Sequence, residues 1–302
     1  MKNITRRVIT TVVALAFCVL PLASHADAAA GGKNGRIVFT RSNQIFTMKP
    51  NGSGVQQLTS GTSGGSDPHW SPDGGSIAYS SDGLYIMNAD GSARTRVTPV
   101  GQTAYGPSWS PDGTKLAFSD GYHLFVINRD GSGMQQITDS SDVNVADYYP
   151  EWSPDGTKIL FVRINDSPVI GTHWILMTVA PDGADSNTIY QTGGSDANIF
   201  SADWSPDGSR IVFNQTRENQ NGDIAHGIYI INADGSGLTI VYETIHPTET
   251  RYPAWSPKGD EIVFSSGDTS LTYQYDLYKM NVDGSHLVQL TTNSGYNLLP
   301  DW

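Results

Sequence analysis

Cysteine and charged residues are scarce in this sequence. Its 302 residues include a single cysteine, Cys18, and only 16 % are charged, against roughly a quarter in soluble domains. Because Cys18 lies among the first thirty residues, the rest of the chain has no thiol for a disulfide bond or for nucleophilic catalysis. The folded part must therefore be held together by its apolar core.

Positive charge is scarcer than negative charge. Eighteen lysine and arginine residues stand against 30 aspartate and glutamate residues, which gives a net charge of -12. This balance repels polyanions and argues against nucleic acid and anionic lipid surfaces as partners. Apolar runs are too dispersed for a multi-span membrane protein, and 38 % hydrophobic residues are too many for a disordered chain. The 32 glycines and 14 tyrosines instead favour strands and tight turns.

The first residues have the order of a secretory signal peptide. Three basic residues, Lys2, Arg6 and Arg7, precede an apolar run from Val8 to Leu22, and small residues follow it. The apolar run is shorter than the about 20 residues that a membrane span needs. We therefore expect a signal peptide at residues 1–26, with cleavage near Ala26 or Ala28, and a short N-terminal segment at 27–34. The mature protein is expected in the periplasm or outside the cell, without stable membrane insertion.

The remaining chain consists of repeats. Trp-Ser-Pro-Asp-Gly occurs four times and Trp-Ser-Pro-Lys-Gly once, beginning at Trp70, Trp109, Trp152, Trp204 and Trp255. An aliphatic residue stands seven positions after each tryptophan and an aromatic residue nine positions after it, and a second turn of the Asp-Gly-Ser type follows. Each unit therefore predicts four short strands joined by tight hairpins. Four-stranded units repeated every 39 to 52 residues predict a β-propeller.

The two ends of the chain predict how many blades the ring has. The sequence stops at Trp302, at the beginning of a further motif, and residues 36–59 contain the part of a repeat that should follow such a tryptophan. We therefore expect the C-terminal segment to supply the inner strand of a blade whose other three strands are N-terminal. Five internal blades and this shared one predict an all-β, six-bladed propeller at residues 35–302, with no large exposed sheet edge.

The repeat resembles those of the TolB family, which are six-bladed propellers. The resemblance covers residues of about 35 to 302, and it implies the same fold. TolB itself binds a peptidoglycan-associated lipoprotein in the cell envelope and carries an N-terminal α/β domain before its propeller. Here the sequence predicts a stand-alone propeller without that domain. The repeat is also similar to that of the oligogalacturonide lyases, which implies a carbohydrate-active alternative.

Candidate functional residues are expected where the blades differ. The connection between the second and third strands is short in three blades and long in the next three, at 162–175, 214–227 and 265–276. These long connections, taken as loops, and the crossovers beside them build up one half of one rim. Aromatic residues and a few charges gather there, a combination that suits peptide or carbohydrate binding. The residues predicted to bind the ligand are Tyr105, Tyr148, Trp174, Phe200, Arg251 and Tyr252.

Arg251 and Tyr252 are expected to enter the channel mouth, where Arg251 could hold a peptide terminus or an acidic side chain. The first hypothesis is a monomeric, non-enzymatic propeller that binds a protein or glycan of the cell envelope, without cofactor, metal or catalytic residues. The alternative is a metal-dependent carbohydrate-active enzyme, because His123, His173, His226 and His246 fall on the same rim. No H-E-x-x-H motif is present.

Overall fold

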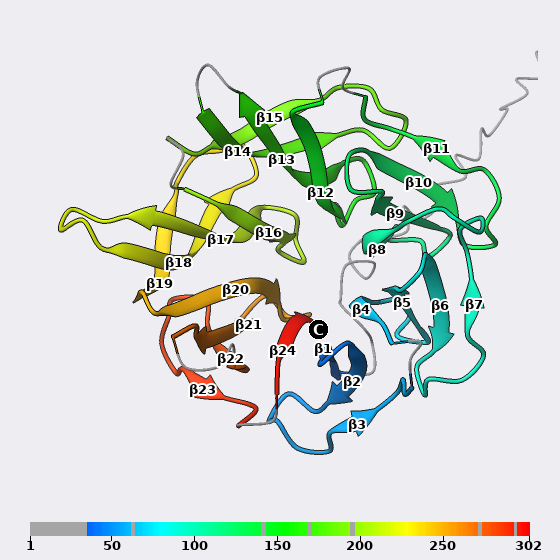
Figure 1. Ribbon diagram of the computed structural model, residues 1–302, viewed down its shortest axis with the longest axis horizontal. Helices are drawn as coiled ribbons and strands as arrows, with labels where there is room; N and C mark the ends of the chain where they lie inside the picture. Colours follow the sequence, from blue (N-terminus) through cyan, green and yellow to red (C-terminus); the bar gives the residue numbers. More distant parts are fainter. Residues whose placement is uncertain are drawn as a thin grey trace, which may run out of the picture.

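Six four-stranded antiparallel sheets stand around a common centre in the computed structural model (Figure 1). The structure describes residues 35–61, 64–139, 143–167, 171–193, 197–270, 274–292 and 295–302. The predicted signal peptide and the segment 27–34 lie outside these residues. The prediction of an all-β, six-bladed propeller is confirmed. The described residues contain no helix long and apolar enough to cross a membrane.

Blades 1 to 3 are built from short strands. Blade 1 comprises β24 (Asn297–Asp301), β1 (Ile37–Arg41), β2 (Gln44–Met48) and β3 (Gln56–Gln57). Blade 2 comprises β4 (Ser66–Trp70), β5 (Ser76–Ser80), β6 (Leu84–Asn88) and β7 (Thr95–Arg96). Blade 3 comprises β8 (Tyr105–Trp109), β9 (Lys115–Ser119), β10 (Leu124–Asn128) and β11 (Gln135–Gln136).

Blades 4 to 6 have longer strands. Blade 4 comprises β12 (Val145–Trp152), β13 (Ile159–Ser167), β14 (Gly171–Val179) and β15 (Asn187–Gln191). Blade 5 comprises β16 (Ile199–Trp204), β17 (Arg210–Glu218), β18 (Ile224–Asn232) and β19 (Thr239–Ile245). Blade 6 comprises β20 (Thr248–Trp255), β21 (Glu261–Asp268), β22 (Gln274–Asn281) and β23 (Val288–Gln289).

The repeated apolar residues form the cores between neighbouring blades. Each of six clusters of buried side chains contains one motif tryptophan and joins two adjacent blades. Trp204, for example, packs with Leu160 of blade 4 and Phe213 of blade 5, and all three are at most 7 % exposed. The fixed offsets in the sequence therefore place one large ring and its partners at the same depth in every blade.

The ring is closed by the two ends of the propeller, as predicted. β24 pairs antiparallel with β1, with Val38 opposite Asp301 and Thr40 opposite Leu298. Trp302 is 6 % exposed and packs with Ile37 of β1. Figure 1 shows β24 beside β1 at the inner edge of blade 1. Closure leaves the inner strand of this blade paired like that of the others.

The Asp-Gly turns are held by their own side chains. In blade 5, Asp207 Oδ1 accepts hydrogen bonds from Ser205 Oγ at 2.6 Å and from the Ser209 amide at 3.0 Å, and Gly208 has a φ of 69°. In blade 6, where Lys258 replaces the aspartate, Ser256 Oγ instead donates to Asp260 Oδ1 at 2.9 Å. The recurrent aspartates are thus turn residues, as the sequence pattern predicts.

The long connections expected to be loops are mostly strands. In blade 4 the β13–β14 ladder runs from Ile159 opposite Val179 to Ser167 opposite Gly171. In blade 5 the β17–β18 ladder reaches Glu218 opposite Ile224, and Figure 1 shows this hairpin extending beyond the ring. β-branched and aromatic residues continue through these segments, so pairing continues instead of ending. The built-up half of the rim is therefore made of hairpins.

Candidate binding site at the mouth of the central channel

Two cavities at the centre of the ring form a channel. One is lined by residues from the inner strands of all six blades, and the other by residues of the Trp-Ser-Pro motifs. The two cavities share His69, Glu151, Asp203 and Asp301 in their walls. The first cavity faces the rim with the long hairpins, because the inner strands begin on that side and end at the motif tryptophans.

A bulge in each inner strand determines which side chains line this first cavity. The pairing register shifts just before the motif tryptophan in every blade, for example between Tyr148 and Glu151 in blade 4. The residues three positions before each tryptophan, here called the belt, all line the cavity: Asp67, Gly106, Tyr149, Ser201, Tyr252 and Leu299. Five of the six have φ between 50° and 55°, the exception being Ser201. A left-handed residue costs about 1–3 kcal/mol unless it is glycine, so the belt points to a functional constraint.

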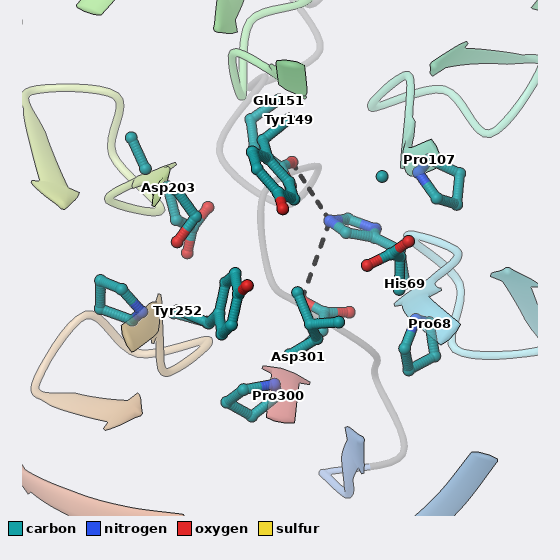
Figure 2. A pocket seen from close by; sticks show the side chains of 16 residues that line it. Pro68, His69, Pro107, Tyr149, Glu151, Asp203, Tyr252, Pro300 and Asp301 are labelled. Atoms are coloured by element: carbon teal, nitrogen blue, oxygen red, sulfur yellow. Dashed lines mark ion pairs between the residues drawn. The ribbon is translucent and has the colours of Figure 1, made fainter. Parts of the chain in front are cut away.

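Two tyrosines of the belt face each other across the channel. The ring centroids of Tyr149 and Tyr252 lie 6.1 Å apart at an interplanar angle of 60°, and Figure 2 shows both side chains pointing inward. Burial raises the pKa of both phenols. Gly106 makes room for this pair, because a Cβ there would stand 3.3 Å from the Tyr149 ring.

A second layer, here called the waist, is formed by the residues immediately before each tryptophan. It consists of His69, Ser108, Glu151, Asp203, Ala254 and Asp301. His69 Nε2 lies 3.2 Å from Glu151 Oε2 and 3.8 Å from Asp301 Oδ1 (Figure 2). Burial disfavours the imidazolium, but the carboxylates of Asp301 and Glu151 outweigh it and raise the pKa of His69 to about 10. The waist thus contains a charged histidine between two carboxylates.

The waist side chains are fixed by bonds to the next blade. Asp301 Oδ2 accepts the Trp70 amide at 2.7 Å, Asp203 Oδ2 accepts the Trp255 amide at 2.8 Å, and Ser108 Oγ accepts the Trp152 amide at 3.0 Å. Ser108 Oγ also donates to Glu151 Oε2 at 2.7 Å. Burial and the charge of Glu151 raise the pKa of Asp203 well above its usual range. The carboxylates are therefore preorganised, at a cost in electrostatic energy.

The structure brings several predicted site residues together beside the belt. The Trp174 and Phe200 rings lie 5.8 Å apart, and the Arg251 guanidinium carbon lies 4.3 Å from the centroid of Phe200. Arg251 Nη2 also forms an ion pair of 2.6 Å with Glu249 Oε2, which accepts the Tyr275 hydroxyl at the same distance. Arg251 thus lies over an aromatic ring and is already paired with a carboxylate.

Tyr148 and Tyr105 lie on the inner strands of blades 4 and 3. Tyr148 packs against Tyr149 with ring centroids 6.3 Å apart, and Tyr105, which is 46 % exposed, lies near enough to contribute to the raised pKa of Tyr148 after burial. We call the six residues Tyr105, Tyr148, Trp174, Phe200, Arg251 and Tyr252 the arc. Of these, Tyr252 lines the channel and Arg251 lies beside its mouth. The bulge is the reason, since it turns the following residue inward.

The rim histidines that were considered as metal ligands have different neighbours. The rings of His226 and His246 lie 6.4 Å apart, and His173 Nδ1 lies 3.0 Å from the Gly171 carbonyl oxygen. Within the described ranges, no group of three or more His, Cys, Asp or Glu side chains is placed to hold a metal ion. The structure thus gives these histidines no common centre there.

The waist and Asp67 were missed by reasoning from the sequence. A signal for the waist does exist, because the residue before the tryptophan varies among His, Ser, Glu, Asp and Ala while proline precedes it in five of six blades. The five polar side chains at this position come together only because the blades form a closed ring. A position whose residue type varies from blade to blade, beside a tryptophan that is the same in every blade, is a candidate functional position.

Comparisons with known proteins agree with this architecture. The family model of the TolB beta propeller domain matches residues 34–198 and 120–302. The crystal structure of TolB from Acinetobacter baumannii is 18 % identical, with a TM-score of 0.70, and the alignment covers 89 % of this chain and 67 % of that one. A putative TolB from Agrobacterium tumefaciens is 21 % identical, with a TM-score of 0.66, covering 88 % of this chain and 90 % of that one.

An oligogalacturonate lyase in complex with manganese also shares the fold. It is 15 % identical, with a TM-score of 0.57, over 86 % of this chain and 75 % of that one. No significant match to a curated protein was found. The structural likenesses are likenesses of fold, whereas the family model covers nearly the whole propeller and confirms the resemblance seen in the repeats. The chain belongs to the TolB beta propeller domain family.

Proposed function

We propose that this chain is an exported, non-enzymatic binding protein of the cell envelope that holds a protein or glycan at the arc. The order of basic, apolar and small residues at 1–26 supports export to the periplasm or beyond. Membership of the TolB beta propeller domain family supports a propeller that binds rather than catalyses. The protein would act as a monomer, since its ring is closed by its own ends.

The observation that carries the proposal is the packed arc at one end of the channel. The Phe200 ring lies 5.8 Å from the Trp174 ring, tilted by 57°, and its centroid lies 4.3 Å from the Arg251 guanidinium carbon. Aromatic residues and arginine dominate binding energy at interfaces, especially where they are preorganised. Glu249 and Tyr275 hold Arg251 in this position. A ligand could therefore bind to a rigid aromatic surface with little ordering cost.

Affinity capture from an envelope extract, with separate assays for proteins and glycans, tests this proposal. Alanine at Trp174, Phe200 or Arg251 should each weaken capture about thirtyfold, because such residues commonly contribute 2 kcal/mol or more. Gln44→Ala serves as a control on the short-stranded half of the same rim, and Asp130→Asn as a control on the Asp-Gly face. Equal losses in the controls, with unchanged thermal unfolding, would show that the arc is not the binding surface.

A further inference from the structure

The charges that line the channel have one predominant sign. Asp67, Glu151, Asp203 and Asp301 contribute four carboxyl groups to the walls, and His69 contributes the imidazole. Among the described residues that line either cavity there is no lysine or arginine. The arginine at the mouth, Arg251, is already paired with Glu249 at 2.6 Å. The channel therefore offers an acidic ligand group no unpaired cation of its own.

The waist already shows what kind of group it accommodates. Its one imidazole is held as a cation between Glu151 and Asp301, at 3.2 and 3.8 Å. Asp203 stands across the channel from His69 (Figure 2) and forms no ion pair with a lysine or arginine of the described chain. Burial and the neighbouring Glu151 raise the pKa of this carboxyl group. The channel therefore contains more carboxyl groups than its one histidine pairs with, and a further cation beside Asp203 would favour the ionised form of that carboxyl group.

The wall above the waist suits an organic cation better than a small anion. Tyr149 and Tyr252 present aromatic rings, and Pro68, Pro107, Pro253 and Pro300 add apolar surface. Ser201 Oγ, on the same wall, is buried and has no hydrogen-bond partner among the described residues. Aromatic faces attract ammonium and guanidinium groups, and apolar walls pack the methylene stem of a long side chain.

We propose that the channel mouth receives a lysine or arginine side chain of a partner protein. The stem would lie against Tyr149 and Tyr252, and the cationic head would face Asp67 and Asp203. This inference rests on the proposed function and specifies its partner as a protein segment with an exposed basic residue. Charge complementarity with a protein of net charge -12 selects the same partner at longer range.

A titration with blocked tripeptides, followed by NMR on the full-length mature protein, tests the inference. The probes are acetyl-Gly-Arg-Gly-amide, its lysine and glutamate analogues, and its citrulline analogue, which keeps the shape of arginine without the charge. We expect the arginine and lysine peptides to bind at least about tenfold tighter than the citrulline peptide. Asp203→Asn should remove most of that difference while it keeps an oxygen for the Trp255 amide.

Controls separate charge in the channel from charge elsewhere. Asp234→Asn, on the exposed Asp-Gly face, should leave the affinities unchanged. Tyr252→Leu should weaken binding of the arginine and lysine peptides, and it replaces Asp203→Asn as the test if that variant fails to fold. Equal affinity for arginine and citrulline, or no binding of arginine up to about 10 mM, would overturn the inference. So would binding that both channel variants leave intact.

The same variants keep this inference distinct from the proposed function. Capture of the envelope ligand that depends on Phe200 but not on Asp203, with no binding of the arginine peptide, would support the arc as the binding surface. The same result would contradict the inference that the channel receives a basic side chain. If capture is indifferent to the whole arc, the proposed function fails whatever the peptides do.

Discussion

Blades 1 to 3 and blades 4 to 6 are built on one repeat but differ in the length of their strands. The second and third strands have five residues in blades 1 to 3, and nine, nine and eight in blades 4, 5 and 6. The buried positions are the same in both halves, since the motif tryptophans are between 2 % and 9 % exposed throughout. Five of the six arc residues lie in the long-stranded half. The comparison indicates that the blade cores and the Asp-Gly face are the same in both halves, whereas the opposite rim, with the hairpins between the second and third strands, varies.

Loss of the closing strand should lower the stability of the protein more than any other proposed change. Deleting residues 298–302 removes most of β24 and the buried Trp302. Truncating one buried tryptophan typically costs about 3–5 kcal/mol of a margin of about 5–15, and the deletion also exposes the edge of β1. We expect aggregation or a much lower Tm in thermal unfolding.

Trp204→Ala is the matched variant in the long-stranded half. Trp204 is 7 % exposed, against 6 % for Trp302, so its loss should cost about as much as Trp302→Ala. Unequal costs would mean that the framework itself differs between the halves. Unchanged unfolding of the deletion variant would show that the ends do not share a blade.

Two ion pairs, one in each half, sharpen the comparison next. Asp147 binds Arg163 through both oxygens at 2.7 and 2.8 Å and is 1 % exposed, whereas Asp82 binds Arg96 at 2.8 Å and is 72 % exposed. Asp147→Ala should lower the free energy of unfolding by about 3 kcal/mol, because it leaves a partly buried arginine unpaired. Asp82→Ala should have no measurable effect, because exposed pairs are screened. Urea unfolding of both variants tests this, and similar costs would contradict it.

The fold was predictable from the sequence because blade packing repeats at fixed offsets. Trp204 and Phe213 occupy the same buried sites as their counterparts, so spacing alone indicated the cores and the closure at Trp302. The long hairpins were misjudged as loops, since their alternating pattern was read only up to the expected turn. The pairing of Arg251 with Glu249 was also within reach, because residues two apart on a strand share a face.

The channel lining was much harder to predict. Tyr149 and Tyr252 point inward because each has a φ near 50°, a conformation that bulky residues rarely adopt and that no local pattern indicates. His69 meets Glu151 and Asp301 only in the closed ring, across more than eighty and more than two hundred residues of sequence. The arc could thus be located by its chemistry, whereas the waist depended on long-range geometry.

The waist joins the two halves and should make stability depend on alkaline pH. The pKa of His69 is raised to about 10, above its unfolded value of about 6.5. Its contribution is therefore complete below about pH 6.5 and is lost as the pH rises through about 10. The raised pKa of Asp203 acts in the same direction. We expect the free energy of unfolding to fall by about 3 kcal/mol from neutral pH to pH 10.

His69→Gln should flatten this alkaline decline in urea unfolding measured at several pH values. His286→Gln is the matched control, since His286 lies on the Asp-Gly face near Asn281 and Ser285, away from the waist. An equally steep decline in His69→Gln would show that the imidazolium between Glu151 and Asp301 does not couple the blades.

The smallest expected effect tests whether the Asp-Gly face is the same in both halves. Hydrogen bonds from Ser71 lower the pKa of Asp73 in blade 2, and hydrogen bonds from Ser205 and Ser209 lower that of Asp207 in blade 5 to about 2. A lowered pKa contributes stability above the unfolded value of about 3.9, and this stability is lost as the pH falls through about 2. Because both side chains are exposed, Asp73→Asn and Asp207→Asn should each cost less than about 1 kcal/mol at pH 7 and reduce the acid dependence equally. Lys258→Ala, at the position in blade 6 that carries no carboxylate, should leave the acid dependence of urea unfolding unchanged. A clear difference between the two asparagine variants would mean that the halves differ on this face as well, and that the division between a preserved face and a variable face is wrong.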